Sequence, residues 1–141
     1  MKKTVTLLAI LTLLTVSLEA GFKSEHEVRQ YADSIVEEVS RGEVSAAIEL
    51  AKEYWPMPTE EMDELSRHTV SQLRQVSNRF GGIIGSEFID EKKMGGSFLR
   101  YRYIVKFENH AIRWVMIFYK PVDEWILNKL NWDDHTDLLF Q

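Results

Sequence analysis

The sequence predicts an α+β fold, in which three N-terminal helices pack on a curved, cone-shaped, four-stranded antiparallel meander. Three observations predict it. Residues 24–80 carry apolar side chains at helical spacing, residues 82–132 alternate between apolar and polar side chains, and turn residues divide this second region into four segments. Because the helical region comes before the strands, we expect the helices to lie together on one face of a single sheet.

The first expected helix begins at a capping box and ends at a glycine. Ser24 is a good N-cap and Glu27 follows three residues later, so each side chain can bind the backbone N–H of the other. Gly42 can end the helix in a left-handed conformation. The helically spaced apolar residues between them are Val28, Tyr31, Ala32, Ile35 and Val39.

Two more helices are expected before the strands. A short amphipathic helix ends before Pro56 and Pro58, because the residue before a proline disfavours the helical conformation. Thr59 is a suitable N-cap for a longer third helix, which Gly81 ends. The short helix carries Val44, Ala47, Ile48 and Ala51, and the stripe of the long helix consists of Met62, Leu65, Thr69, Leu73, Val76 and Phe80. We expect the long helix to lie across the aromatic face of the sheet.

Two-residue turns set the expected register of the first two hairpins. Glycines 95–96 accept the positive φ of a type I′ turn, and this turn pairs Asp90 with Tyr101. A second turn at 109–110 pairs Tyr103 with a methionine. The two turns together place seven residues on one face, which are Phe88, Tyr101, Tyr103, Val105, Trp114, Met116 and Phe118.

The last hairpin is expected to turn at residues 121–124, where a proline favours a type I turn. This turn pairs Phe118 with Leu127. Beyond that pair the alternation changes, because Leu130 and Trp132 fall on the opposite face from Leu127. Either a β-bulge or burial of both faces explains the change.

Residues 1–20 have the pattern of a secretory signal peptide. A basic start at residues 2–3 precedes a short apolar run, and cleavage is expected near Ala20. An uncleaved anchor is the alternative, although the run is short for a membrane span. Residues 21–141 are then one domain, which we expect in the periplasm or outside the cell.

Composition narrows the function classes. The formal charge of −5 lacks the basic footprint of a nucleic-acid binder, and the absence of cysteine excludes a disulfide scaffold and a cysteine nucleophile. The four histidines show no metal-ligand spacing, and no phosphate-loop or dinucleotide motif is present. The acidic segment 133–137 is interpreted as a solvated end rather than a cation site. We therefore predict no metal and no cofactor.

The element order and the closing hairpin carry a family resemblance. Helices are followed by a curved sheet whose last hairpin reads Trp-Val-Met-Ile-Phe-Tyr-Lys-Pro-Val-Asp-Glu-Trp-Ile-Leu at 114–127. This resembles the nuclear-transport-factor-2-like superfamily, the cystatin-like and ketosteroid-isomerase-like α+β proteins, over about residues 24–134. The resemblance implies a pocket between helices and sheet and dimerisation through the outer sheet face. That superfamily includes both enzymes and non-catalytic modules, so the fold does not assign a function.

The aromatic face is the candidate ligand pocket, with ordinary core as the alternative. Asp90, expected beside Tyr101, is the candidate catalytic base of an isomerase-like enzyme that uses Tyr101 or Tyr103 as hydrogen-bond donor; the alternative is a solvated strand end. His68 on the third helix belongs either to the pocket edge or to the surface. The candidate pocket consists of Phe88, Tyr101, Tyr103, Trp114, Met116, Phe118 and Trp125.

The outer face of the sheet interleaves basic and aliphatic side chains. This pattern predicts an interface with a second copy or a protein partner, in which the arginines bind acids, and a solvated face is the alternative. The interface residues are Arg100, Arg102, Ile104, Arg113, Val115 and Ile117. We therefore expect an exported, non-catalytic module that binds an apolar ligand or a protein. An isomerase- or dehydratase-like enzyme and a structural assembly domain are the alternatives.

Overall fold

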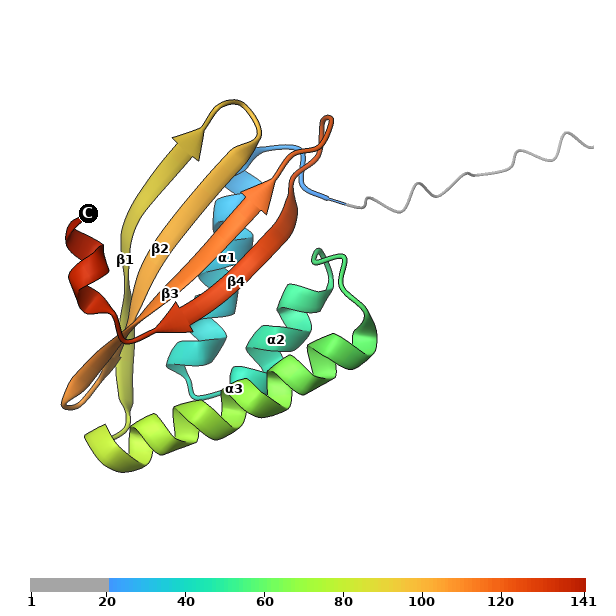
Figure 1. The fold of residues 1–141 in the computed structure, drawn as a ribbon. Coiled ribbons are helices and arrows are strands. Elements are labelled where there is room, and N and C mark those ends of the chain that lie inside the picture. The colour runs from blue at the N-terminus through green and yellow to red at the C-terminus, as the bar shows by residue number, and fades with distance from the viewer. Residues whose placement is uncertain (1–20) are drawn as a thin grey trace, which may run out of the picture.

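The computed structural model describes residues 21–141, and its architecture is the predicted one: three helices, then four antiparallel strands in one open sheet (Figure 1). The expected signal peptide lies outside the described residues. The strands are ordered β1-β2-β3-β4. The elements are α1 (Glu25–Ser40), α2 (Val44–Lys52), α3 (Thr59–Phe80), β1 (Ile83–Met94), β2 (Phe98–Phe107), β3 (His110–Tyr119), β4 (Ile126–Asp133) and a 3-10 helix, η1 (Thr136–Phe140).

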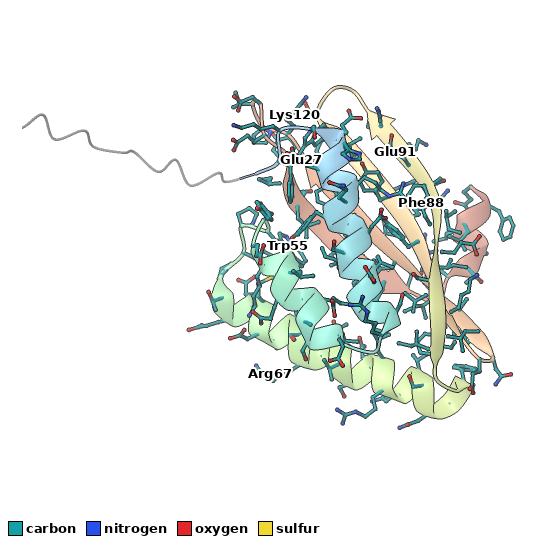
Figure 2. All side chains as sticks on the ribbon, turned by 180° about the vertical axis from the view of Figure 1, so that it is seen from behind. Glu27, Trp55, Arg67, Phe88, Glu91 and Lys120 are labelled. Carbon is teal, nitrogen blue, oxygen red and sulfur yellow. The ribbon has the colours of Figure 1, made fainter. Side chains whose placement is uncertain are left out.

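The helix that lies across the sheet is α1, so the expectation that α3 would do so was wrong (Figure 2). The predicted capping box at Ser24 and Glu27 is present and starts α1. The helix buries a full face against the sheet and α2, whereas α3 packs mainly on α2. The buried residues of α1 are Val28, Tyr31, Ala32, Ile35, Val36 and Val39.

The β1–β2 hairpin turns over three residues, 95–97, instead of the predicted two. The extra residue shifts the register by one, so Asp90 pairs with Arg102 and not with Tyr101. Because side chains alternate between faces, this shift moves Asp90 from the concave face to the outer face. A register irregularity between Phe88 and Asp90 then restores the predicted pairing of Phe88.

The β2–β3 turn is at 108–109 rather than 109–110, which moves the register by two residues. Tyr103 consequently pairs with Trp114 and not with Met116. A shift of two leaves every side chain on its predicted face, because the alternation has a period of two. The predicted aromatic face is therefore correct even though its pairs between β2 and β3 were wrong.

The β3–β4 hairpin has the predicted pairing of Phe118 with Leu127. A register irregularity follows between Ile117 and Phe118, which brings Leu130 opposite Met116. Of the two explanations for the changed alternation, the β-bulge is confirmed. The bulge turns Leu130 and Trp132 back toward the concave face, where they lie opposite Met116 and Trp114. No helix among residues 21–141 is long and apolar enough to cross a membrane.

Candidate functional site

The predicted aromatic pocket lies under α1 and is packed with its own side chains. Tyr101, Trp114, Met116 and Phe118 are 0 % exposed, and Tyr103 and Trp125 are 3 % exposed. Only Phe88, near the β1 edge, is half-buried, and the Arg29 guanidinium covers its ring at 3.4 Å. These rings form the centre of the hydrophobic core.

Two tyrosine hydroxyls of this face hold α1 on the sheet. The hydroxyl of Tyr103 donates to Asp33 Oδ1 at 2.6 Å, and Arg29 Nε donates to the same oxygen at 2.8 Å. The Tyr101 hydroxyl donates to the backbone carbonyl of Glu25 at 3.3 Å. Burial raises the pKa of both tyrosines, so both hydroxyls remain protonated donors at neutral pH.

A groove with a volume of about 590 Å³ lies between α3 and strands β3 and β4. It forms because α3 is fixed at its two ends. Near its start, Lys52 on α2 binds Asp63 at 2.6 Å, and after its end the Asn109 N–H donates to the carbonyl of Phe80 at 2.9 Å. Only three of the 22 residues of α3 are buried, namely Met62, Thr69 and Leu73.

Both walls of the groove carry apolar side chains. The wall on the sheet consists of residues from the ends of β3 and β4 that face the helices, and the wall on α3 consists of half-buried residues of its predicted stripe. Phe80 stacks on the His110 ring, with 4.1 Å between ring centroids. The apolar lining residues are Leu65, Val76 and Phe80 on α3 and Ile112, Leu130 and Trp132 on the strands.

Polar groups are interspersed along the same walls. They include amides, which both donate and accept hydrogen bonds, and two imidazole rings. His68 lines this groove with an exposed side chain, away from the predicted aromatic pocket. The polar lining residues are His68, Thr69, Gln72, Gln75, Arg79, His110, Asn131, Asp133 and Asp134. The groove therefore combines six apolar side chains with nine polar ones. Small-molecule sites likewise join apolar walls to polar groups that orient the ligand.

One buried donor beside the groove has no partner among the described residues, the indole N–H of Trp114. Trp114 is 0 % exposed. Its cross-strand neighbour Trp132 and its same-face neighbour Ile112 both line the groove. A buried unsatisfied N–H costs roughly 1–3 kcal/mol, which the packing of the ring in the core has to offset.

The candidate base Asp90 lies on the outer face, across the sheet from the groove. Arg102 Nε donates to Asp90 Oδ1 at 2.7 Å, and a second guanidinium nitrogen binds Oδ2. These hydrogen bonds hold the pKa of Asp90 below its ordinary value, opposite to the raised pKa expected of a pocket base. The interpretation of Asp90 as a carboxylate beside Tyr101 was therefore wrong.

The predicted interface residues share the outer face but differ in exposure. Arg102 is 5 % exposed, because η1 lies over it and its Nη1 donates to the Leu138 carbonyl at 2.8 Å. Arg113 binds Asp133 with two hydrogen bonds, at 2.8 and 2.6 Å, and these lower the pKa of Asp133. The half-buried members are Arg100, Ile104, Arg113, Val115 and Ile117.

Sequence reasoning missed the groove, although it identified residues on its helical wall. The stripe on α3 was expected to lie across the aromatic face, and the amides at Gln72 and Gln75 beside that stripe were the available signal of an incompletely covered face. Among residues 21–141, no group of three metal-ligating side chains comes together. The segment 133–137 instead folds back, with the His135 N–H donating to Asp133.

Comparisons with known proteins add no relative. No family model matches the chain, no curated protein matches it, and no solved structure matches it.

Proposed function

We propose that this chain is a non-catalytic binding module that takes a small, largely apolar ligand into the groove between α3 and strands β3–β4. One observation carries the proposal: the long helix α3 leaves apolar residues of its stripe half-buried along a hollow of about 590 Å³. Typical ligand sites have volumes of roughly 300–1,000 Å³, so the groove has the right size.

The lining defines the chemistry of the ligand. Leu65 and Val76 on one wall and Trp132 on the other suit an apolar body that fits between helix and sheet. Gln72 and Asn131 suit one or two polar groups on that body, because amides both donate and accept.

The architecture supports membership of the nuclear-transport-factor-2-like superfamily as part of this proposal. Helices on one side of a four-stranded antiparallel sheet, with a groove open at one end of the concave face, are compatible with that cone-shaped fold. The leader-like pattern of residues 1–20 supports export of the module. Asp90, the candidate base of the enzyme alternative, is on the other face of the sheet and does not line the groove.

Binding of the fluorescent probe 1-anilinonaphthalene-8-sulfonate to residues 21–141 tests the proposal. Val76→Arg places a long cationic chain in the groove, and Ser71→Arg makes the same kind of change at an exposed position of α3 outside it. We expect the probe to bind the wild-type chain and the Ser71 variant, and to lose at least about tenfold in affinity in the Val76 variant. Equal affinity in all three chains would contradict the proposal, provided that circular dichroism shows all three folded.

A further inference from the structure

The outer face of the sheet holds more cations than its own acids can neutralise. Arg102 and Arg113 are each satisfied by a carboxylate, Asp90 and Asp133 respectively. Arg100 is not: its nearest carboxylate oxygen is Oδ1 of Asp90 at 3.7 Å, and that oxygen already accepts from Arg102. Arg100 is therefore left with a weak, shared counter-ion.

The Arg100 guanidinium also has a buried hydrogen-bond donor without a partner. Its Nε is enclosed and makes no hydrogen bond with any described residue, while the side chain as a whole remains 30 % exposed. Desolvation, followed by repulsion from Arg102 and Arg113, lowers the pKa of Arg100. Both observations indicate positive charge that the chain itself leaves uncompensated.

Two lysines extend this charge across the sheet. Lys92 on β1 pairs with Arg100 on β2, Arg100 pairs with Ile117 on β3, and Ile117 pairs with Lys129 on β4. Neither lysine has an ion pair within 4.0 Å among residues 21–141. Strands lie about 4.8 Å apart, so this cationic row crosses roughly 14 Å of the outer face.

Apolar side chains border the cationic row. Ile117 lies within it, and the rings of Phe98 and Tyr119 stack beside it with centroids 5.1 Å apart. Phe98 is 40 % exposed, and Met94, which pairs with it, is 61 % exposed. A mixture of apolar and cationic groups is typical of a surface that binds polypeptide.

We propose that the cationic row of Lys92, Arg100 and Lys129 binds an acidic segment of a partner protein, with Arg100 as the central carboxylate receptor. A guanidinium matches the two oxygens of a carboxylate, and an extended peptide advances about 3.3 Å per residue. Carboxylates four residues apart therefore span about the width of the row. Side chains of an extended peptide alternate between its two sides, so glutamates at every second position face the row, and their methylene groups contact Ile117.

Charge complementarity selects this partner over two others. A symmetric pair of copies through this face brings the cationic row against itself, which is repulsive. A polyanionic membrane or nucleic acid is repelled at long range by a chain of formal charge −5. A short acidic segment carries only a few charges, so this long-range repulsion is much weaker for it than for a polyanion.

The test uses a fluorescein-labelled peptide of sequence Glu-Val-Glu-Val-Glu and residues 21–141. We expect saturable binding that weakens with added salt, and a shift of the Arg100 side-chain Nε–H resonance on binding. Arg100→Gln is expected to weaken binding by at least about tenfold. The matched control is Arg67→Gln, on α3 away from the sheet (Figure 2), which is expected to change affinity by less than about twofold.

Three results would overturn the inference. The first is absence of peptide binding, or binding that Arg100→Gln leaves unchanged. The second is binding to phosphatidylglycerol vesicles, sensitive to Arg100→Gln, without binding of the peptide. The third is self-association that Arg100→Gln abolishes while the peptide fails to bind. The Val76→Arg groove variant is expected to bind the peptide normally, because Val76 is on the other side of the sheet.

Discussion

Helices α1 and α3 are both amphipathic, but they cover the concave side of the sheet in different ways. The 16-residue α1 buries six residues and lies directly on the strands, whereas the 22-residue α3 buries three and leaves a groove. Two tyrosine hydroxyls reach from the sheet to α1. Helix α3 is held instead through its neighbours, α2 at one end and the β2–β3 turn at the other.

The difference shows that an apolar stripe does not fix how deeply a helix is buried. Burial depends on the surface that the stripe meets, and most of the stability of a helix in a protein comes from that packing. The apolar stripe of α1 packs on a continuous layer of aromatic side chains on the β-sheet. The α3 stripe divides between α2 and open space, so the same pattern produces core in one helix and a groove wall in the other.

The largest expected loss of stability is at α1, the helix that packs directly on the strands. Ile35 on α1 is 0 % exposed, so Ile35→Ala is expected to lower the free energy of unfolding by about 2–5 kcal/mol. Urea denaturation followed by circular dichroism measures it. A decrease in the free energy of unfolding below about 1 kcal/mol would mean that packing of α1 on the sheet does not stabilise the core as described.

The next largest loss of stability is expected on the outer face of the sheet. Arg102→Met keeps the buried stem but removes the hydrogen bonds to Asp90 and Leu138, and is expected to cost about 1–2 kcal/mol at neutral pH. The pKa of Asp90 is lowered in the folded chain, so its contribution is complete above the unfolded value of about 3.8 and declines as pH falls through the folded pKa. The difference between wild type and variant should therefore shrink below about pH 4.

Denaturation of both chains at pH 7 and pH 3 measures that difference. A difference that stays constant between the two pH values would contradict the role given to the Asp90–Arg102 pair. The Asp90 carboxyl resonance offers a direct check, since its pKa should rise in the variant when the guanidinium is lost.

A smaller loss of stability is expected when the side-chain hydrogen bond between α1 and the sheet is removed. Tyr103→Phe removes one hydroxyl that donates to Asp33, while the ring keeps its packing. The expected loss is about 1 kcal/mol. Thermal unfolding measures the change, and Tyr119→Phe, on the outer face, is the matched control. A Tyr103 variant as stable as wild type would show that the hydroxyl contributes nothing to holding α1.

The smallest loss of stability is expected at α3, the helix that borders the groove. Leu65 on α3 is half-buried in the groove wall, so Leu65→Ala removes little enclosed surface and should cost no more than about 1 kcal/mol. Equal losses for Leu65→Ala and Ile35→Ala in the same urea experiment would remove the contrast between the two helices.

The sequence was sufficient for the fold class, the element order and the aromatic face, because these depend on periodicity and on capping residues such as Ser24 and Gly42. It was insufficient for two turns. A three-residue turn at 95–97 changed the face of Asp90, whereas the displaced turn at 108–109 moved the register by two and changed no face. The one additional residue in this glycine-rich turn therefore determined on which face of the sheet Asp90 lies.

The groove was beyond sequence reasoning for a different reason. Leu65 and Val76 satisfy the helical pattern whether they meet a sheet or open space. Their placement depends on the anchors at the two ends of α3, such as the Lys52–Asp63 pair, which join residues distant in sequence. Local patterns do not contain that information.

Acrylamide quenching of tryptophan fluorescence tests the central contrast most directly, because only one of the four tryptophans lines the groove. Trp114 and Trp125 are at most 3 % exposed and Trp55 is 9 % exposed, whereas Trp132 is half-buried in the groove wall. We expect the wild-type protein to have a readily quenched fraction of its fluorescence, Trp132→Phe to remove this fraction, and bound probe to shield it. A quenched fraction that persists unchanged in Trp132→Phe would show that the concave side opens elsewhere, and would contradict the account.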